Sequence, residues 1–272
     1  PFFSRRFGQR CSVHHQGSSA LIMDTATLSE TSWRRYPYLK FSQIDESIKR
    51  KIYFLIFANG TVVKSAWERS LFLLPAFLDV YDCNVIIIDW STSARKTYYF
   101  ARMDIEKVAP FVGRFLDFLV VEGNTSMQNV HLLGHSLGGH LVGLSSRASK
   151  VGKPKRLTAL DPALPLFQTE LKNHRLDKSD GPFVEVMHTS GGILGFMDPL
   201  GHADFYVNGG TRQPGCGMDP ARVCAHMRAH VLYAELVRNP GQFTARVCDS
   251  MGEAQAEMCN GEELRWIDSV KW

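Results

Sequence analysis

A serine lies between two glycines in the stretch NVHLLGHSLGGHLVG, which spans residues 129–143. The five residues GHSLG, centred on Ser136, fit the pattern G-x-S-x-G. In that pattern a tight turn joins a strand to a helix and presents the serine hydroxyl at the carboxyl edge of a sheet, where helix amide groups can stabilise an oxyanion. An apolar run precedes Ser136 and a helical pattern follows it, so we interpret Ser136 as a nucleophile. The alternative is a structural Gly-Ser-Gly turn.

A serine nucleophile needs a general base, and the base needs an acid that orients it. In sheet hydrolases the chain order is serine, acid, histidine, and the acid follows a later strand. Asp161 comes directly after the apolar run RLTAL, so we predict that it is the acid. Its alternative role is to cap the turn at Asp161-Pro162. Three other aspartates are weaker rivals: Asp177, Asp180 and Asp204.

The order rule leaves five histidines as candidates for the base: His174, His188, His202, His226 and His230. We favour His226, which follows Cys224 by two residues at the start of the last helical pattern, because a disulfide there would fix its backbone. His188 ends a predicted strand and fits better as a buried, hydrogen-bonded histidine. His202 lies in a glycine-rich loop, and His230 lies one turn further along the helix, on the surface or in the core.

Apolar runs that alternate with helical patterns must position these residues. Five runs are predicted to be buried strands: residues 51–57, 84–90, 129–133, 156–160 and 183–188. Four stretches show helical spacing: residues 67–78, 105–119, about 137–148 and about 225–238. This alternation indicates an α/β fold with a mainly parallel central sheet flanked by helices. We predict an irregular N-terminal segment over residues 1–48, packed on one catalytic domain over residues 49–272.

Composition excludes several classes of protein. The chain has 272 residues, of which 44% are hydrophobic, so it can bury a sizeable core. A net charge of +4, from 31 basic and 27 acidic residues, is too mild to indicate a nucleic-acid partner. No apolar run approaches the ~18 residues that a membrane span requires. The chain begins at Pro1 without a basic and apolar leader, which we interpret as a processed form. Nothing in the pattern selects an oligomeric state.

The cysteines indicate an oxidising compartment. There are six: Cys11, Cys83, Cys216, Cys224, Cys248 and Cys259. An even number with two closely spaced pairs, 216/224 and 248/259, favours disulfides over reduced core cysteines, which remain the alternative. Two N-x-[ST] sequons, at Asn59 and Asn124, are glycosylation candidates and agree with secretion. We therefore predict a secreted, extracellular protein.

Five motifs occur in a fixed order within residues 52–259: NVIIIDWS, VHLLGHSLGGHLVG, LTALDPALPLF, RLDKSDGPFVEVMHTSGGILGFMDPLGHADFYVNGGTRQPGC and CAHMRAH. Together they resemble the pancreatic-lipase family, and within it the short-lid phospholipase A1 branch found among insect lipases. The resemblance implies an α/β-hydrolase fold and the triad Ser136, Asp161 and His226. It also implies a serine hydrolase that acts on lipid esters without a cofactor, above all a phospholipase A1 that releases the sn-1 fatty acid.

The resemblance further implies how the cysteines pair. Cys216–Cys224 would close a lid loop, and Cys248–Cys259 would close a later hairpin. Cys11–Cys83 is the remaining pair and would tie the N-terminal segment to the sheet. Only seven residues, 217–223, separate the lid cysteines. A short lid leaves the pocket open to water and lacks a broad apolar face, so we expect phospholipids to be preferred over triglycerides. A triacylglycerol lipase is the alternative.

Relatives that hydrolyse triacylglycerol carry a further C-terminal lipid-binding domain, which we do not expect here. The segment RLDKSD, residues 175–180, is similar to a structural calcium loop of some relatives. Asp177 and Asp180 would supply its carboxylates. Surface acids without a bound ion are the favoured interpretation of these two residues, so we predict no metal and no required cofactor.

The oxyanion loop departs from the family pattern. The implied donors are the backbone N–H groups of Leu137 and Asn59, and Asn59 occupies a position where the family usually has an aromatic residue after His-Gly. Counted back from Trp67, this chain has FAN at residues 57–59. Losing one such donor costs about 2.7–4 kcal/mol. The departure, together with a sequon at the mouth of the site, leaves one further alternative, a non-catalytic lipid-binding or yolk-type protein on the same fold.

Overall fold

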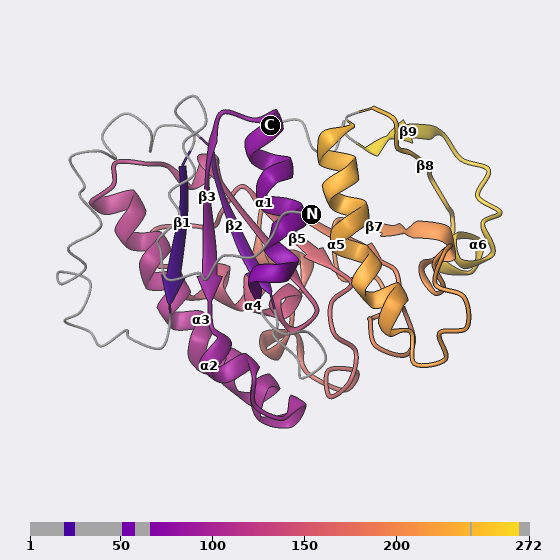
Figure 1. Cartoon of the computed structure of the whole chain (residues 1–272), viewed down its shortest axis with the longest axis horizontal. Helices are drawn as coiled ribbons and strands as arrows, with labels where there is room; N and C mark the ends of the chain where they lie inside the picture. Colours follow the sequence, from indigo (N-terminus) through magenta and orange to yellow (C-terminus); the bar gives the residue numbers. More distant parts are fainter. Residues whose placement is uncertain (1–18, 25–50, 58–65, 240, 267–272) are drawn as a thin grey trace, which may run out of the picture.

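A parallel sheet forms the centre of the molecule. The computed structural model describes residues 19–24, 51–57, 66–239 and 241–266. Within them, seven strands form one sheet in the order β1-β3-β2-β4-β5-β6-β7, and every neighbouring pair is parallel (Figure 1). The strands are β1 (Ser19–Asp24), β2 (Lys51–Phe57), β3 (Cys83–Asp89), β4 (Val130–His135), β5 (Arg156–Leu160), β6 (Val184–His188) and β7 (Ala203–Tyr206).

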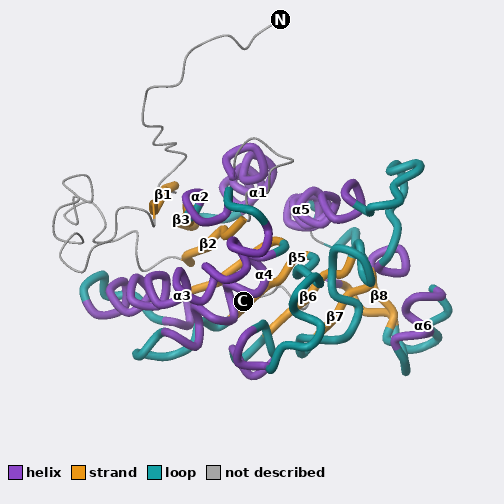
Figure 2. Tube along the Cα trace, turned by 90° about the horizontal axis from the view of Figure 1, so that it is seen from below, coloured by secondary structure: helices purple, strands orange, loops and turns teal. Residues whose placement is uncertain are grey.

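Helices cover both faces of this sheet. They are α1 (Ala66–Val80), α2 (Ser91–Ala94), α3 (Tyr98–Val121), α4 (Leu137–Ala148), α5 (Val223–Arg238) and α6 (Met251–Ala256). Figure 2 shows the sheet between α1 and α5 on one face and α3 and α4 on the other. Alternate strand residues point to opposite faces. Phe54 and Ile56 therefore join the core under α3 and α4, whereas Tyr53 and Leu55 join the core under α1 and α5.

The predicted α/β class is confirmed, and each of the five predicted strands is present. Their apolar runs are fully buried between two helical layers, which is why they read as continuous rather than alternating patterns. The helix predicted over residues 137–148 is α4 with the same bounds. Short 3-10 helices complete the connections: η5 (Met127–Asn129), η6 (Lys172–His174), η7 (Lys178–Asp180) and η8 (Val207–Gly210).

The irregular N-terminal segment is a prediction that the structure corrects in part. Strand β1 lies within it and pairs with β3 from Ser19 opposite Asn84 to Asp24 opposite Asp89. Four apolar residues in ALIM are too few to show a period, and the ladder with β3 supplies the order that the sequence does not reveal. The rest of that segment, residues 1–18 and 25–48, lies outside the described residues.

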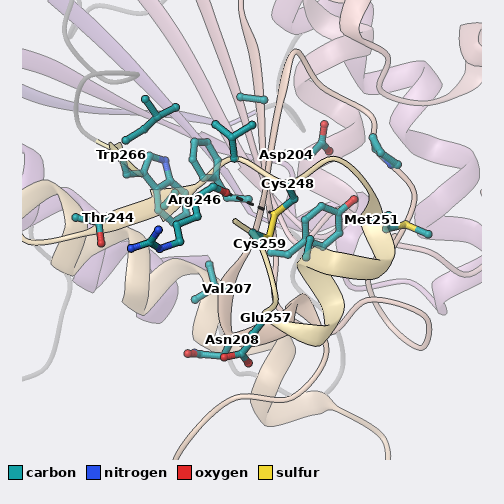
Figure 3. A pocket seen from close by; sticks show the side chains of 18 of the residues that line it. Asp204, Val207, Asn208, Thr244, Arg246, Cys248, Met251, Glu257, Cys259 and Trp266 are labelled. Carbon is teal, nitrogen blue, oxygen red and sulfur yellow. Dashed lines mark hydrogen bonds between the residues drawn. A yellow bond between two sulfur atoms is a disulfide. The ribbon is translucent and has the colours of Figure 1, made fainter. Parts of the chain in front are cut away.

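A small C-terminal substructure flanks the edge strand β7. It consists of the antiparallel pair β8 (Thr244–Arg246) and β9 (Glu263–Arg265), helix α6 and the disulfide Cys248–Cys259. A groove of about 940 Å³ separates it from β7, with Asp204, Arg246 and Trp266 among the residues that line it (Figure 3). Among the described residues, no helix combines the length and the apolar character that a membrane span requires.

Candidate active site

Ser136 occupies a sharp turn between β4 and α4. Its backbone has φ 59° and ψ −122°, a conformation that costs a serine free energy and that the surrounding structure must enforce. The flanking glycines are required by close backbone approach. A Cβ atom on Gly134 would lie 2.1 Å from the Gly138 carbonyl oxygen, and one on Gly138 would lie 2.2 Å from the Ile56 carbonyl oxygen. The geometry thus explains why both glycines flank this serine.

The helix after this turn supplies amide groups at the serine. Leu137 is the first residue of α4, and N–H groups in the first turn of a helix have no partner within the helix. The helix dipole also places partial positive charge at this end. The second implied oxyanion donor, Asn59, lies outside the described residues, as does the sequon that it begins. The other sequon residue, Asn124, is exposed just after α3.

Asp161 and His226 form a hydrogen-bonded pair beside this turn. Asp161 directly follows β5 and is fully buried, and its Oδ2 accepts a 2.6 Å hydrogen bond from Nδ1 of His226 near the start of α5. Burial pushes the pKa of the Asp161 carboxyl upward, but hydrogen bonds from His226 and Ser190 outweigh burial and hold that pKa below its usual value. The carboxyl therefore stays ionised and can orient the imidazole.

The end of β4 also holds His226 by its backbone. His135, the residue before Ser136, donates a 2.8 Å hydrogen bond from Nε2 to the His226 carbonyl oxygen, and the two rings lie 4.4 Å apart. The Ser136 amide donates to Leu160 O, one residue before Asp161, at 3.1 Å. Among the hydrogen bonds of the described residues, none joins the Ser136 hydroxyl to His226. Such contacts are often long before substrate binds. The contacts of His135, of the Ser136 amide and of Asp161 bring the three predicted residues to the same edge of the sheet.

Residues after β6 complete the surroundings of the acid, and no motif in the sequence predicts them. The amides of Thr189 and Ser190 donate to Asp161 Oδ1 at 2.8 and 3.0 Å, and the Ser190 hydroxyl donates to Oδ2. The signal that could have revealed them is their position just past a buried strand, next to the strand that ends at Asp161.

The rival residues take part in other contacts. Asp204 lies 2.8 Å from buried His188, and the His202 ring accepts a hydrogen bond from the Val184 amide. His174 pairs with Glu106 at 3.1 Å. His230 lies one turn beyond His226, with its ring 5.6 Å from that of His135. The side-chain contacts of Asp204, His202 and His174 are thus with groups other than the Asp161 carboxylate and the His226 ring.

Asp177 and Asp180, the weak calcium candidates, close the turn of η7. Their side chains form a reciprocal capping box with the backbone of this turn. Arg147 Nε lies 2.9 Å from an Asp180 carboxylate oxygen, and Lys172 Nζ lies 3.3 Å from one of Asp177. Cations of this chain already balance both carboxylates, so this donor set does not favour calcium. That no metal binds here stays a prediction.

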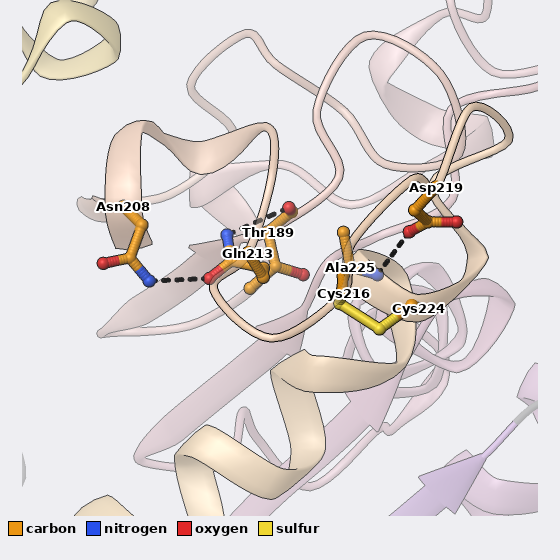
Figure 4. Close-up of a disulfide and its surroundings, with 7 residues drawn as sticks. All are labelled: Thr189, Asn208, Gln213, Cys216, Asp219, Cys224 and Ala225. Atoms are coloured by element: carbon orange, nitrogen blue, oxygen red, sulfur yellow. Dashed lines mark hydrogen bonds between the residues drawn. A yellow bond between two sulfur atoms is a disulfide. The ribbon is translucent and has the colours of Figure 1, made fainter.

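The lid loop leads directly into the helix that carries His226. The Cys216–Cys224 disulfide closes it, with the Cα atoms 5.6 Å apart (Figure 4). Asp219 within the loop accepts a 2.9 Å hydrogen bond from the Ala225 amide. Both close cysteine pairs are therefore bonded as the resemblance implied. The third implied pair involves Cys11, which lies outside the described residues. Cys83 is buried at the start of β3, and burial raises the pKa of its thiol to about 12.

Gln213, which precedes the lid, was also missed from sequence. Its amide nitrogen donates to the carbonyl oxygens of Thr189 at 3.1 Å and Val207 at 2.8 Å, and its oxygen accepts from Asn208 (Figure 4). Arg222 likewise donates to the carbonyl oxygen of Gly191. These contacts fix the segment after β6 against the acid. The groove beside β7 is lined by none of the three predicted catalytic residues.

A serine on a strand–helix turn of a parallel sheet, beside a buried aspartate that is hydrogen-bonded to a histidine, is typical of serine hydrolases with an α/β fold. The chain belongs to the lipase family, because the family model described as Lipase matches residues 39–264. It is 36% identical over 193 residues to mouse Lipase member H, covering 69% of this chain and 42% of the relative.

Two further relatives match this chain at similar identity and coverage. Pancreatic triacylglycerol lipase of Myocastor coypus is 33% identical, with 77% of this chain and 50% of the relative covered. Human pancreatic lipase-related protein 3 is 33% identical, with 82% and 53% covered. The chain thus spans about half the length of the curated relatives that it matches. A solved α/β hydrolase from a deep-sea metagenome library overlaps 58% of this chain and 63% of its own at 18% identity and a TM-score of 0.40, too low to add to the fold described above.

Proposed function

We propose that this protein hydrolyses carboxylic esters of lipids, with Ser136 as nucleophile, His226 as base and Asp161 as orienting acid. The observation that carries the proposal is the hydrogen bond between the buried Asp161 carboxylate and His226, next to the turn that presents Ser136. Membership of the lipase family supports lipid esters as the substrate class.

The reaction is acyl transfer in two steps. His226 takes the proton of the Ser136 hydroxyl as its oxygen attacks the ester carbonyl, and Asp161 stabilises the imidazolium. The Leu137 amide, together with the amide at Asn59, binds the oxyanion. His226 then donates the proton to the leaving alcohol, and an acyl-enzyme remains. Water, deprotonated by His226, releases the fatty acid and restores Ser136. The chemistry needs no cofactor.

We further propose a phospholipase A1-type specificity. The short disulfide-closed lid supports it, because such a loop covers little apolar surface. The proposal places the enzyme outside the cell, as the two disulfides favour. Triacylglycerol lipase remains the second candidate, supported by the relatives that carry that name.

Apolar side chains around the site support a lipid substrate. Tyr99 and Phe100 at the start of α3 are 57% and 58% exposed, and Leu166 is exposed in the loop after β5. The Tyr98 hydroxyl donates to Pro165 O at 2.7 Å and joins these two segments. Both segments follow the carboxyl ends of strands, the edge at which Ser136 lies. Exposed apolar groups that gather in one place indicate an interaction surface.

A substrate panel tests the proposed function. Phosphatidylcholine vesicles with differently labelled sn-1 and sn-2 chains would be compared with emulsified long-chain triacylglycerol, and Ser136→Ala would serve as the inactive control. We expect release of the sn-1 fatty acid and accumulation of the 2-acyl lysophospholipid. Equal or faster hydrolysis of the triacylglycerol would overturn the phospholipase assignment, and activity that persists in Ser136→Ala would overturn the nucleophile.

A further inference from the structure

The Ser190 hydroxyl lies between the two members of the acid–base pair. It donates to Asp161 Oδ2, and its Oγ lies 3.4 Å from His226 Nδ1. Oδ2 is also the oxygen that accepts the hydrogen bond from His226. We infer that Ser190 is a positioning residue, whose hydroxyl holds the Asp161 carboxylate in the orientation that receives His226. This inference rests on the proposed function and deepens it.

The two carboxylate oxygens of Asp161 are held in different ways. Oδ1 accepts from two backbone amides, those of Thr189 and Ser190, which are fixed by the chain. On Oδ2, the proposed reaction changes the charge of one donor, His226, in every cycle. The Ser190 hydroxyl is the other donor and keeps its proton throughout. It therefore gives Oδ2 a constant partner, and hydrogen bonds to a carboxylate are stronger than those between neutral groups.

Burial and the neighbouring backbone hold the Ser190 side chain against Asp161. Ser190 and Asp161 are both fully buried, so water cannot replace a lost hydrogen bond without entering the site. The chain turns back over the carboxylate at Gly195, where a Cβ atom would lie 2.3 Å from Asp161 Oδ1. The Gly195 amide donates to the Ser190 carbonyl oxygen at 3.3 Å. Removing the hydroxyl would thus leave Oδ2 with the imidazole as its only donor.

Thr189 offers a matched control. It is the neighbouring residue, is equally buried, and its amide also donates to Asp161. Its hydroxyl, however, has no hydrogen-bond partner in the described part of the chain. Thr189→Val therefore removes a buried hydroxyl from the same strand end and keeps all four hydrogen bonds to the carboxylate. A general effect of disturbing this segment would appear in both variants, whereas a positioning role appears only in Ser190→Ala.

The experiment compares wild type, Ser190→Ala, Ser190→Thr and Thr189→Val. The first readout is the second-order rate constant with which a fluorophosphonate modifies Ser136. We expect Ser190→Ala to lower it about tenfold, the scale of one hydrogen bond to a charged group. Thr189→Val should stay within about twofold of wild type. Ser190→Thr keeps the hydroxyl and should recover most of the rate. Thermal unfolding of each variant checks that the fold is retained.

A second readout does not depend on catalysis. The Nδ1 proton of His226, which is hydrogen-bonded to Asp161, should give a downfield proton resonance that is assigned by its loss in His226→Ala. We expect it to move further downfield in Ser190→Ala, because Oδ2 then accepts one hydrogen bond, and to stay in place in Thr189→Val. Unchanged rate and resonance in Ser190→Ala would overturn the positioning role and leave the proposed function intact. If wild type itself does not react, the proposed function fails, and the resonance alone decides whether Ser190 contacts the pair.

Discussion

Asp161 has a specific donor for each of its lone-pair directions. Two backbone amides, one hydroxyl and the imidazole of His226 all point at one buried carboxylate. These donors keep the group ionised in a fully buried place, where a lone carboxylate would take up a proton. The side chain can thus orient the histidine and balance the imidazolium.

Replacing this carboxylate by an amide tests the assignment. Asp161→Asn keeps the shape of the side chain, but its NH2 group would face groups that donate hydrogen bonds to the carboxylate in wild type. An NH2 group facing Nδ1 would favour the His226 tautomer that lacks the Nδ1 proton. We expect kcat to fall by about 10⁴ on a soluble ester, by analogy with other serine triads, with the thermal unfolding curve close to wild type. A variant that keeps more than a tenth of the activity would mean that another carboxylate orients the base.

At this scale the sequence predicts the site residues that belong to motifs. It does not predict the residues of distant loops that fold against the site. Ser136, Asp161 and His226 follow from strand ends and chain order. Ser190 and Gln213 belong to loops whose course depends on packing against the acid, which no local pattern encodes.

Helix α4 and the turn η7 pack against each other through a buried acid. A Cβ atom on Gly143 would lie 2.4 Å from Asp180 Oδ2, and the Ser146 hydroxyl donates to the Asp180 carbonyl oxygen at 2.6 Å. Asp180 is fully buried, so water and dissolved cations do not reach its carboxylate. Burial raises the pKa of its carboxyl to about 6, in spite of the nearby Arg147.

This pKa predicts how stability changes with pH. The folded state binds the Asp180 proton more tightly than the unfolded state, whose pKa lies near 3.8. The stabilising contribution is therefore complete below pH 4 and is lost as the pH rises to about 6. The difference corresponds to at most about 3 kcal/mol of unfolding free energy. Urea denaturation of wild type and Asp180→Asn from pH 4 to 7 measures it, because the variant cannot titrate at this position.

Wild type should lose stability relative to Asp180→Asn across this window. A difference that stays constant, or that grows in favour of wild type as the pH rises, would show that the Arg147 ion pair outweighs burial. In that case the carboxyl would be ionised throughout and its pKa would not be raised.

The lid disulfide links an element boundary to the base. Cys224 lies two residues before His226 in α5, so opening the Cys216–Cys224 bond frees the start of this helix. We expect Cys216→Ser/Cys224→Ser to lose about 2–3 kcal/mol of unfolding free energy and to lower kcat more than tenfold. Cys248→Ser/Cys259→Ser is the matched control: it opens a similar loop away from the site and should lose stability with activity kept within about twofold. Equal activity losses in both would contradict the link.

Element prediction succeeds where the pattern is long and apolar. The five buried runs became strands because two helical layers cover them. Strand β7 (ADFY) and strand β1 were missed, since each lies at an edge of the described sheet, where pairing with β6 or β3 decides the structure.

At the scale of the whole molecule, several exposed apolar side chains lie on segments that follow the carboxyl ends of the strands. Tyr99, Phe100 and Leu166 are exposed where strands end beside the site, and Met218 is 99% exposed in the lid. An apolar rim therefore exists even though the lid is short. Val121 lies at the other end of α3 and is also exposed, at 66%, but next to the amino ends of the strands.

The rim predicts a difference between dispersed and dissolved substrates. Tyr99→Ser/Phe100→Ser should lower hydrolysis of phosphatidylcholine vesicles about tenfold or more. Burying one large apolar side chain in the lipid contributes roughly 1.5–3 kcal/mol of binding free energy, and the variant loses this contribution at both positions. Hydrolysis of a short soluble ester should not change. Val121→Ser should leave both activities as in wild type. Equal effects of the two variants on vesicles would contradict a role for this rim.

The central claim is that Ser136, His226 and Asp161 form a working acylation site, and fluorophosphonate labelling of the purified protein tests it most directly. The adduct would be located by mass spectrometry in wild type and in His226→Ala. We predict a single adduct on Ser136 that is absent in His226→Ala. A folded wild-type protein that forms no adduct, or one that His226→Ala forms equally well, would contradict the claim and favour a lipid-binding protein on a hydrolase fold.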